Sequence, residues 1–216
     1  MKTLGKFQKV DLRDYWEDEA KEFTPWLSKD ENIEILSEAI GIDIEIEGKE
    51  VSVGNYKADL VGRDILNNKK IIIENQLEKT NHDHLGKIIT YASGIEASII
   101  IWICKTITEE HRQAIDWLNE NMDDNIGFFA IEIELWKIDG SNPAPKFNII
   151  CRPVEKDMGV VLNWQELPDG QDSRIILYSN GNIKDKSQWD EISEWFKKYA
   201  ELFYKAFNER VKKLKL

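Results

Sequence analysis

The sequence has little of what marks secreted or membrane proteins. It contains two cysteines, Cys104 and Cys151, and both lie in apolar, strand-like stretches. Two isolated thiols predict small core residues in a reducing compartment rather than a disulfide framework. The chain has no apolar run of about 18 residues, and residues 1–20 lack the apolar segment of a secretory signal. We therefore expect a cytoplasmic protein that does not contact a membrane.

Acidic residues outnumber basic residues, and the formal net charge of the 216 residues is −11. This balance argues against an extended nucleic-acid footprint, which usually gives a basic chain. The charge is uneven, however, since residues 196–216 hold seven basic and two acidic side chains. This segment is either a phosphate-contacting tail or a solvated helix end.

Several catalytic motifs are missing. The sequence has no P-loop, no G-x-S-x-G and no H-E-x-x-H, so a P-loop nucleotide hydrolase, an α/β-hydrolase and a zincin lack support. Its three histidines, His82, His84 and His111, have no cysteine nearby at ligand spacing, which argues against a four-ligand zinc site. We interpret His82 and Asp83 as caps of a helix and His111 as a packed side chain.

The first part of the chain shows alternating helical and strand patterns. Thr24 and Pro25 predict the start of a helix, and Ile33, Leu36 and Ile40 form its apolar stripe. Residues 42–47 and 50–61 then alternate like strands, with Gly48 and Gly54 at turn or bulge positions. Residues 70–76, 97–104 and 127–138 are further strands, and residues 81–94 and 109–122 are helices. This order predicts a three-layer α/β sandwich around a mixed sheet.

The pattern loosens around Pro143 and Pro145. We therefore divide the chain into a first domain, residues 1–145, and a small α+β extension, residues 146–216. The extension is expected to hold short strands and a long helix that Ser187 caps. Aromatic residues recur on this helix at helical spacing, which is typical of packing and is compatible with a homodimer.

The stretch 57–92 carries the chemistry. Residues 71–73, Ile-Ile-Ile, predict a strand buried on both faces, yet Glu74-Asn75-Gln76 follows directly, and Asp59 lies on the strand before. A buried carboxylate costs several kcal/mol unless it is paired. If the two strands pair, Asp59 and Glu74 converge with Gln76 beside them. The two carboxylates and the Asn75 carbonyl then form a site for a hard cation, Mg²⁺ or Mn²⁺.

With "ADL" at 58–60, "IIIENQ" at 71–76 and the element order αβββαβ, residues 20–138 resemble the PD-(D/E)XK nuclease superfamily, whose fold is restriction endonuclease-like. The resemblance implies that Asp59 and Glu74 bind the metal and that Gln76 occupies the third position, which is usually Lys. A longer set of sequence segments, including "FTPWL" and "EEHRQAIDWLNE", is similar to bacterial nuclease-like proteins of mostly unassigned role. In these a C-terminal domain follows the core, and the segment after Pro153 resembles a shortened form of it.

The departure at the third position matters for activity. Gln76 is neutral and offers only amide hydrogen bonds in place of a positive charge. A substitute cation could come from the next helix, where His84, Lys87 and Tyr91 share one face. Lys87 is then either a functional contact or a solvated side chain. Glu50, on the preceding strand, is either an additional ligand or an exposed strand residue.

Two functions follow from this sequence. The first is a metal-dependent endonuclease that hydrolyses phosphodiester bonds, with DNA as the expected partner. The second is a catalytically degenerate nuclease fold that binds nucleic acid or a protein without cleavage, because a fold does not fix an activity.

Overall fold

The computed structural model describes residues 4–123, 125–153, 163–166, 173–177, 179 and 181–212. The chain forms two compact units, Met1–Arg152 and Pro153–Leu216. This boundary falls later than the division we placed after residue 145. The reason is that strand β7 (Ala144–Cys151) pairs along β6 (Gly127–Ile138) and thereby joins the first unit.

The first unit is built on a mixed seven-stranded sheet in the order β1-β6-β5-β4-β3-β2, with β7 also paired to β6. The pairs β4–β5 and β5–β6 are parallel and the others are antiparallel. The remaining bounds are β1 Phe7–Val10, β2 Ile44–Val53, β3 Tyr56–Asp64, β4 Lys70–Lys79 and β5 Ile99–Thr106.

Local sequence explains the central strands. Strand β5 is buried from Ile99 to Cys104, as its continuous apolar run predicts for a strand covered on both faces. Strand β2 is continuous, with Gly48 at a shift in its register with β3. Gly54 has φ of 59° in the turn that closes the β2–β3 hairpin, a conformation that glycine adopts without strain.

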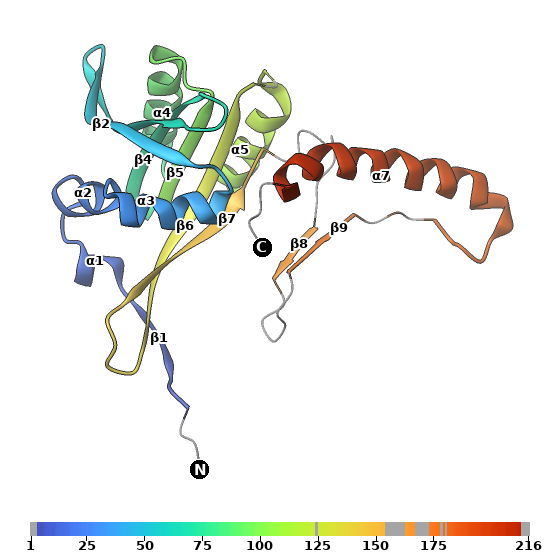
Figure 1. Ribbon diagram of the computed structural model, residues 1–216, viewed down its shortest axis with the longest axis horizontal. Helices are drawn as coiled ribbons and strands as arrows, with labels where there is room; N and C mark the ends of the chain where they lie inside the picture. Colours follow the sequence, from blue (N-terminus) through green and yellow to red (C-terminus); the bar gives the residue numbers. More distant parts are fainter. Residues whose placement is uncertain are drawn as a thin grey trace. The chain divides into compact units, whose positions relative to one another are not determined.

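Helices cover both faces of this sheet (Figure 1). The π-helical turn η1 (Glu19–Phe23), α2 (Thr24–Leu27) and α3 (Asp30–Ile40) pack over one apolar cluster that contains Phe23, Leu36 and Ile73. Helices α4 (His82–Gly94) and α5 (Glu109–Asn121) pack over a second cluster that contains Ile72, Ile88 and Trp102. The predicted three-layer α/β fold with a mixed sheet is confirmed.

Local details differ from the prediction. A helix begins at Thr24 with Pro25 in its first turn, as predicted, but Thr24 does not cap it, and the π-helical turn η1 precedes it. The apolar stripe of Ile33, Leu36 and Ile40 lies on the separate helix α3. Asn81, rather than His82 or Asp83, caps α4 by accepting a hydrogen bond from His84 N. Strand β1, which pairs with the end of β6 and is followed by the short helix α1 (Leu12–Tyr15), was not predicted.

The second unit contains the antiparallel pair β8 (Asn163–Glu166) and β9 (Ser173–Ile176), the 3₁₀ turn η2 (Lys186–Gln188) and the long helix α7 (Trp189–Lys212). Ser187 lies inside η2, which Asp185 caps by accepting from Ser187 N, so the predicted cap was wrong. Residues 213–216 of the basic tail lie outside the described residues. No helix in the described ranges is long and apolar enough to cross a membrane.

Candidate metal centre

The candidate site lies where strands β3 and β4 separate. Their ladder runs from Arg63 opposite Lys70 to Leu60 opposite Ile73, and β4 then continues to Lys79. Beyond this ladder, carboxylate side chains rather than the backbone of β3 accept hydrogen bonds from the amides of β4. Asn75 N donates to Asp59 Oδ2 at 2.8 Å, and Leu77 N donates to a carboxylate oxygen of Glu19. Side chains thus accept from edge amides that a strand would otherwise satisfy.

Glu74 is the second of the predicted acids. Its Oε1 accepts a hydrogen bond from Asp59 N at 3.2 Å, so Glu74 bonds the backbone of β3 while Asp59 bonds the backbone of β4. Only 4% of the Glu74 surface is exposed. The structure therefore brings the predicted acids together at a buried strand end.

Burial dominates the electrostatics of this pair. Desolvation raises the pKa of Asp59 to about 7, and the negative charges of Glu19 and Glu50 add to the rise. Desolvation, followed by the charge of Asp59, raises the pKa of Glu74 to about 9. Two desolvated carboxylates whose negative charges repel favour keeping a proton, so the metal-free pair resists full ionisation near neutral pH.

The amides beside the acids are also buried. Asn75 Nδ2 donates to Thr24 Oγ1 at 2.9 Å, and Gln76 Nε2 donates to the Lys79 carbonyl at 2.9 Å. Gln76 Oε1 is buried and has no hydrogen-bond partner among the described residues. Because the N–H and C=O of one strand residue face the same edge, the Asn75 carbonyl projects toward the edge where Asp59 lies.

This donor set fits a hard divalent cation. All of its atoms are oxygens, two are on carboxylates that need neutralisation, and Gln76 Oε1 is an acceptor without a partner among the described residues. Across the ranges that the structure describes, no group of three His, Cys, Asp or Glu side chains could hold a metal ion by itself. Mg²⁺ needs only one or two carboxylates, because it keeps several waters.

Helix α4 places a positive charge near the acids. The positive charge of Lys87 partly offsets the rise in the pKa of both Asp59 and Glu74. Its ammonium lies 3.6 Å from Asp83, and its side chain is 42% exposed. Lys87 is therefore near the site yet free to reorient, because an exposed i,i+4 ion pair is weak.

Glu50 faces solvent on the neighbouring strand. Its flanking residues Lys49 and Val51 pair with Leu60 and Ala58, which puts Glu50 opposite Asp59. Its side chain is exposed and its φ is 51°. The structure thus places Glu50 close enough to raise the pKa of Asp59 but does not bury it with the other acids.

Glu19 was missed by the sequence analysis. It lies in an acidic stretch, residues 17–22, that reads as a solvated surface, and it comes 58 residues before its partner Leu77. Burial raises the pKa of Glu19 despite its hydrogen bond from Leu77 N. No local signal distinguishes Glu19 from its acidic neighbours, so only the fold identifies it.

His111 is a packed side chain, as predicted. His111 is 5% exposed, and its Nδ1 lies 2.9 Å from the hydroxyls of Thr80 and Thr108. Its Nε2 lies 3.0 Å from His82 Nδ1, whereas His84 contacts Asn81. Two neighbouring imidazoles fall short of the four ligands of a structural zinc site.

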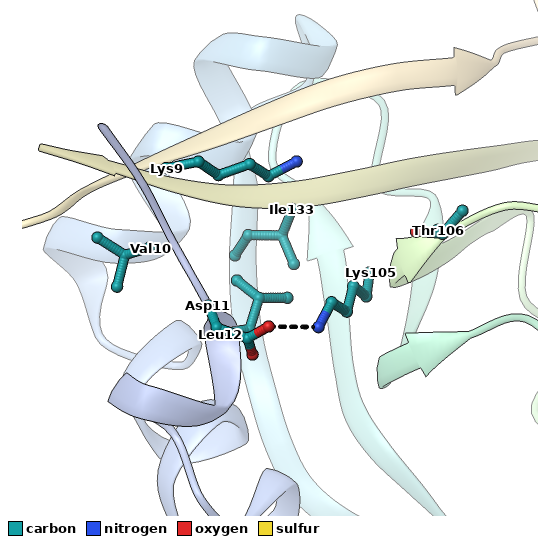
Figure 2. Close-up of a pocket in the computed structure, with 7 residues that line it drawn as sticks. All are labelled: Lys9, Val10, Asp11, Leu12, Lys105, Thr106 and Ile133. Carbon is teal, nitrogen blue, oxygen red and sulfur yellow. Dashed lines mark hydrogen bonds and ion pairs between the residues drawn. The ribbon is translucent and has the colours of Figure 1, made fainter. Parts of the chain in front are cut away.

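A pocket of about 360 Å³ opens elsewhere, between the end of β5 and the segment after β1 (Figure 2). Lys105 and Asp11 face each other across it, with 2.7 Å between Lys105 Nζ and Asp11 Oδ2. Asp59 and Glu74 are not among its lining residues. The candidate metal centre is thus defined by the separation of two strands and not by this cavity.

Comparisons with known proteins give two matches. Residues 152–211 match a family model described as a domain of unknown function, DUF4268, and this segment starts where the first compact unit ends. A crystal structure of a repair endonuclease from Pyrococcus abyssi is similar over 47% of this chain and 44% of that chain, with 14% identity and a TM-score of 0.40. No curated protein matches the sequence.

Proposed function

We propose that the chain is a metal-dependent nuclease that hydrolyses phosphodiester bonds in nucleic acid, with DNA as the expected substrate and Mg²⁺ or Mn²⁺ as the cofactor. The observation that carries this proposal is the pair Asp59 and Glu74. Both carboxylates are largely withdrawn from water, and their raised pKa values mark two acids that need a cation to ionise together. Asp59, Glu74 and the Asn75 carbonyl would hold the ion.

When bound, the ion supplies positive charge that neutralises the acids and polarises the scissile phosphate. The protein supplies orientation. The hydrogen bond from Gln76 Nε2 to the Lys79 carbonyl fixes the amide, so Gln76 Oε1 is available to accept a hydrogen bond that orients the attacking water. Lys87 can leave Asp83 and bring its charge to a phosphate oxygen.

The deciding experiment is cleavage of supercoiled plasmid and of linear single-stranded DNA by the purified chain, with Mg²⁺ or Mn²⁺ and with EDTA. We expect cleavage of one or both substrates with metal and none with EDTA. A preparation of Asp59→Ala, purified in the same way, controls for contaminating nucleases. If neither DNA is cut and Mn²⁺ does not raise the melting temperature, the nuclease proposal fails.

That negative result favours the second candidate, a module that binds without cutting. The neutral side chain at Gln76 supports this alternative, because losing one charged contact to a transition state can raise the barrier by about 3–4 kcal/mol. A homodimer remains a prediction for either function.

Gln76→Lys tests the role of the third position. If Gln76 occupies the place of the usual lysine, the new ammonium can still donate to the Lys79 carbonyl and adds positive charge beside Glu74. We expect the cleavage rate to stay the same or to rise several-fold. Gln76→Met, which has a similar volume and no polar group, should lower the rate. A complete loss of activity in Gln76→Lys would show that the amide itself is required.

A further inference from the structure

An exposed aromatic ring lies on the side of the sheet that α4 covers, which is also the side that Glu74 faces. Tyr56 is the first residue of β3, directly after the hairpin turn at Gly54, and 56% of its surface is exposed. Its ring lies 6.0 Å from the ring of Tyr91 on α4, at an interplanar angle of 39°. Tyr91 itself is 4% exposed, so Tyr56 is the part of this aromatic pair that solvent reaches.

Tyr91 connects Tyr56 to the acids. The pKa of Tyr91 is raised first by burial and then by the negative charges of Glu74 and Asp59. Ala58, two residues after Tyr56, packs with Tyr91 in the cluster under α4. Alternate strand residues face the same side of a sheet. Tyr56 therefore faces α4 together with Ala58, and Glu74 faces α4 together with Ile72, which packs in the same cluster.

The position of Tyr56 is fixed by packing. Val53 pairs with Tyr56 across the hairpin, and it contacts α4 so closely that a Cβ on Gly94 would lie 2.5 Å from Val53 Cγ1. The hairpin end therefore rests directly on α4. The backbone of Tyr56 is thereby anchored and its ring contacts Tyr91, so less conformational entropy is lost when a ligand stacks on the ring.

We propose that Tyr56 is a stacking platform for an unpaired nucleobase next to the scissile phosphate, so that the substrate is single-stranded nucleic acid. This inference rests on the proposed function and specifies its substrate. A base in an intact duplex is covered on both faces by its neighbours, whereas an unpaired base can stack on a protein aromatic. Lys87, on the same side, supplies positive charge for the adjoining backbone.

Binding of a fluorescein-labelled DNA strand of about 12 nucleotides tests this role, measured by anisotropy in the Glu74→Gln background so that no cleavage occurs. One series of strands carries a single abasic position, moved stepwise along the strand. At one position, loss of the base should weaken binding about tenfold. Tyr56→Ala should weaken binding of the intact strand to the same extent and should abolish the effect of the abasic position.

Matched variants separate stacking from folding. Tyr56→Phe keeps the ring and should bind like the parent, while Tyr56→Leu keeps an apolar side chain and should bind like Tyr56→Ala. Trp117→Ala removes another aromatic residue, 61% exposed on α5, and should leave binding unchanged. The same DNA as a duplex should bind more weakly, with no response to Tyr56→Ala.

The inference is overturned if Tyr56→Ala binds the intact strand as tightly as the parent, if the abasic effect persists in Tyr56→Ala, or if the parent does not bind the strand. These results are independent of cleavage. Wild-type chain that cuts DNA while Tyr56→Ala binds normally would leave the nuclease proposal intact. Conversely, suppose that the chain never cuts DNA but that the tenfold abasic effect is present and disappears in Tyr56→Ala. The stacking role of Tyr56 would then stand, and the nuclease proposal would fail.

Discussion

Asp59→Asn is expected to abolish metal-dependent cleavage and, at the same time, to make the metal-free protein more stable at about pH 8. The amide retains an oxygen that can accept the hydrogen bond from Asn75 N, so the strand ends stay connected. The substitution Asp59→Asn removes a negative charge that metal binding requires, which should lower the cleavage rate at least about a thousandfold. Glu74→Gln should behave in the same way, because its amide oxygen can still accept from Asp59 N.

The gain in stability follows from the raised pKa values. Asp59 has an ordinary pKa near 3.8 and a folded pKa of about 7, so the folded chain binds a proton more tightly than the unfolded chain between these values. The free energy of unfolding of the metal-free wild type therefore falls as the pH rises through this window. Asp59→Asn escapes that loss and should gain on the order of 2–4 kcal/mol at about pH 8, and nothing at about pH 4.

Thermal or urea unfolding in EDTA at both pH values measures this difference. Glu38→Gln, which changes an exposed acid on α3, is the control and should leave stability and cleavage unchanged. With Mn²⁺ present, the order should reverse, because wild type gains binding energy that Asp59→Asn lacks. If Asp59→Asn is less stable than wild type in EDTA at the higher pH, the acids are not a repelling, desolvated pair.

Metal binding should depend strongly on pH. In the metal-free protein, Glu74 with a pKa of about 9 and Asp59 with a pKa of about 7 hold protons that the cation must displace. From about pH 9 down to about pH 7, the dissociation constant for Mn²⁺ should rise about tenfold for each pH unit, because one proton competes. Below about pH 7 the second proton joins, and the slope should steepen toward a hundredfold for each unit.

Titration calorimetry in buffers of different ionisation enthalpy counts these protons directly. We expect release of about one proton for each Mn²⁺ at about pH 8. Asp59→Asn should bind Mn²⁺ far more weakly at every pH. A dissociation constant that stays flat between about pH 6 and about pH 9 would show that both carboxylates ionise at ordinary pKa values and that the buried pair is not the metal site.

Much of the site was predictable because its pattern is local. An apolar strand that ends in Glu74, Asn75 and Gln76, with Asp59 on the strand before, forces polar groups into a buried region whatever the details of packing. Burial of both faces of β4 and the shared face of Glu74 and Gln76 follow from residue types and from the period of two. The cap at Asn81 was misassigned because Asn, His and Asp in succession offer competing caps, and the backbone of the preceding residues decides among them.

The sequence by itself determined the order of strands and helices from α3 to β6 and which of their residues are apolar enough to cover both faces of the sheet, since these depend on periodicity along the chain. Only the tertiary structure decided where β3 leaves β4, and therefore which amides need acceptors. It also brought Glu19 from 58 residues away to accept a hydrogen bond from Leu77 N, and it set the ring of Tyr56 against Tyr91 by resting the hairpin on α4. These contacts join segments distant in sequence, and no local pattern encodes the distance between them.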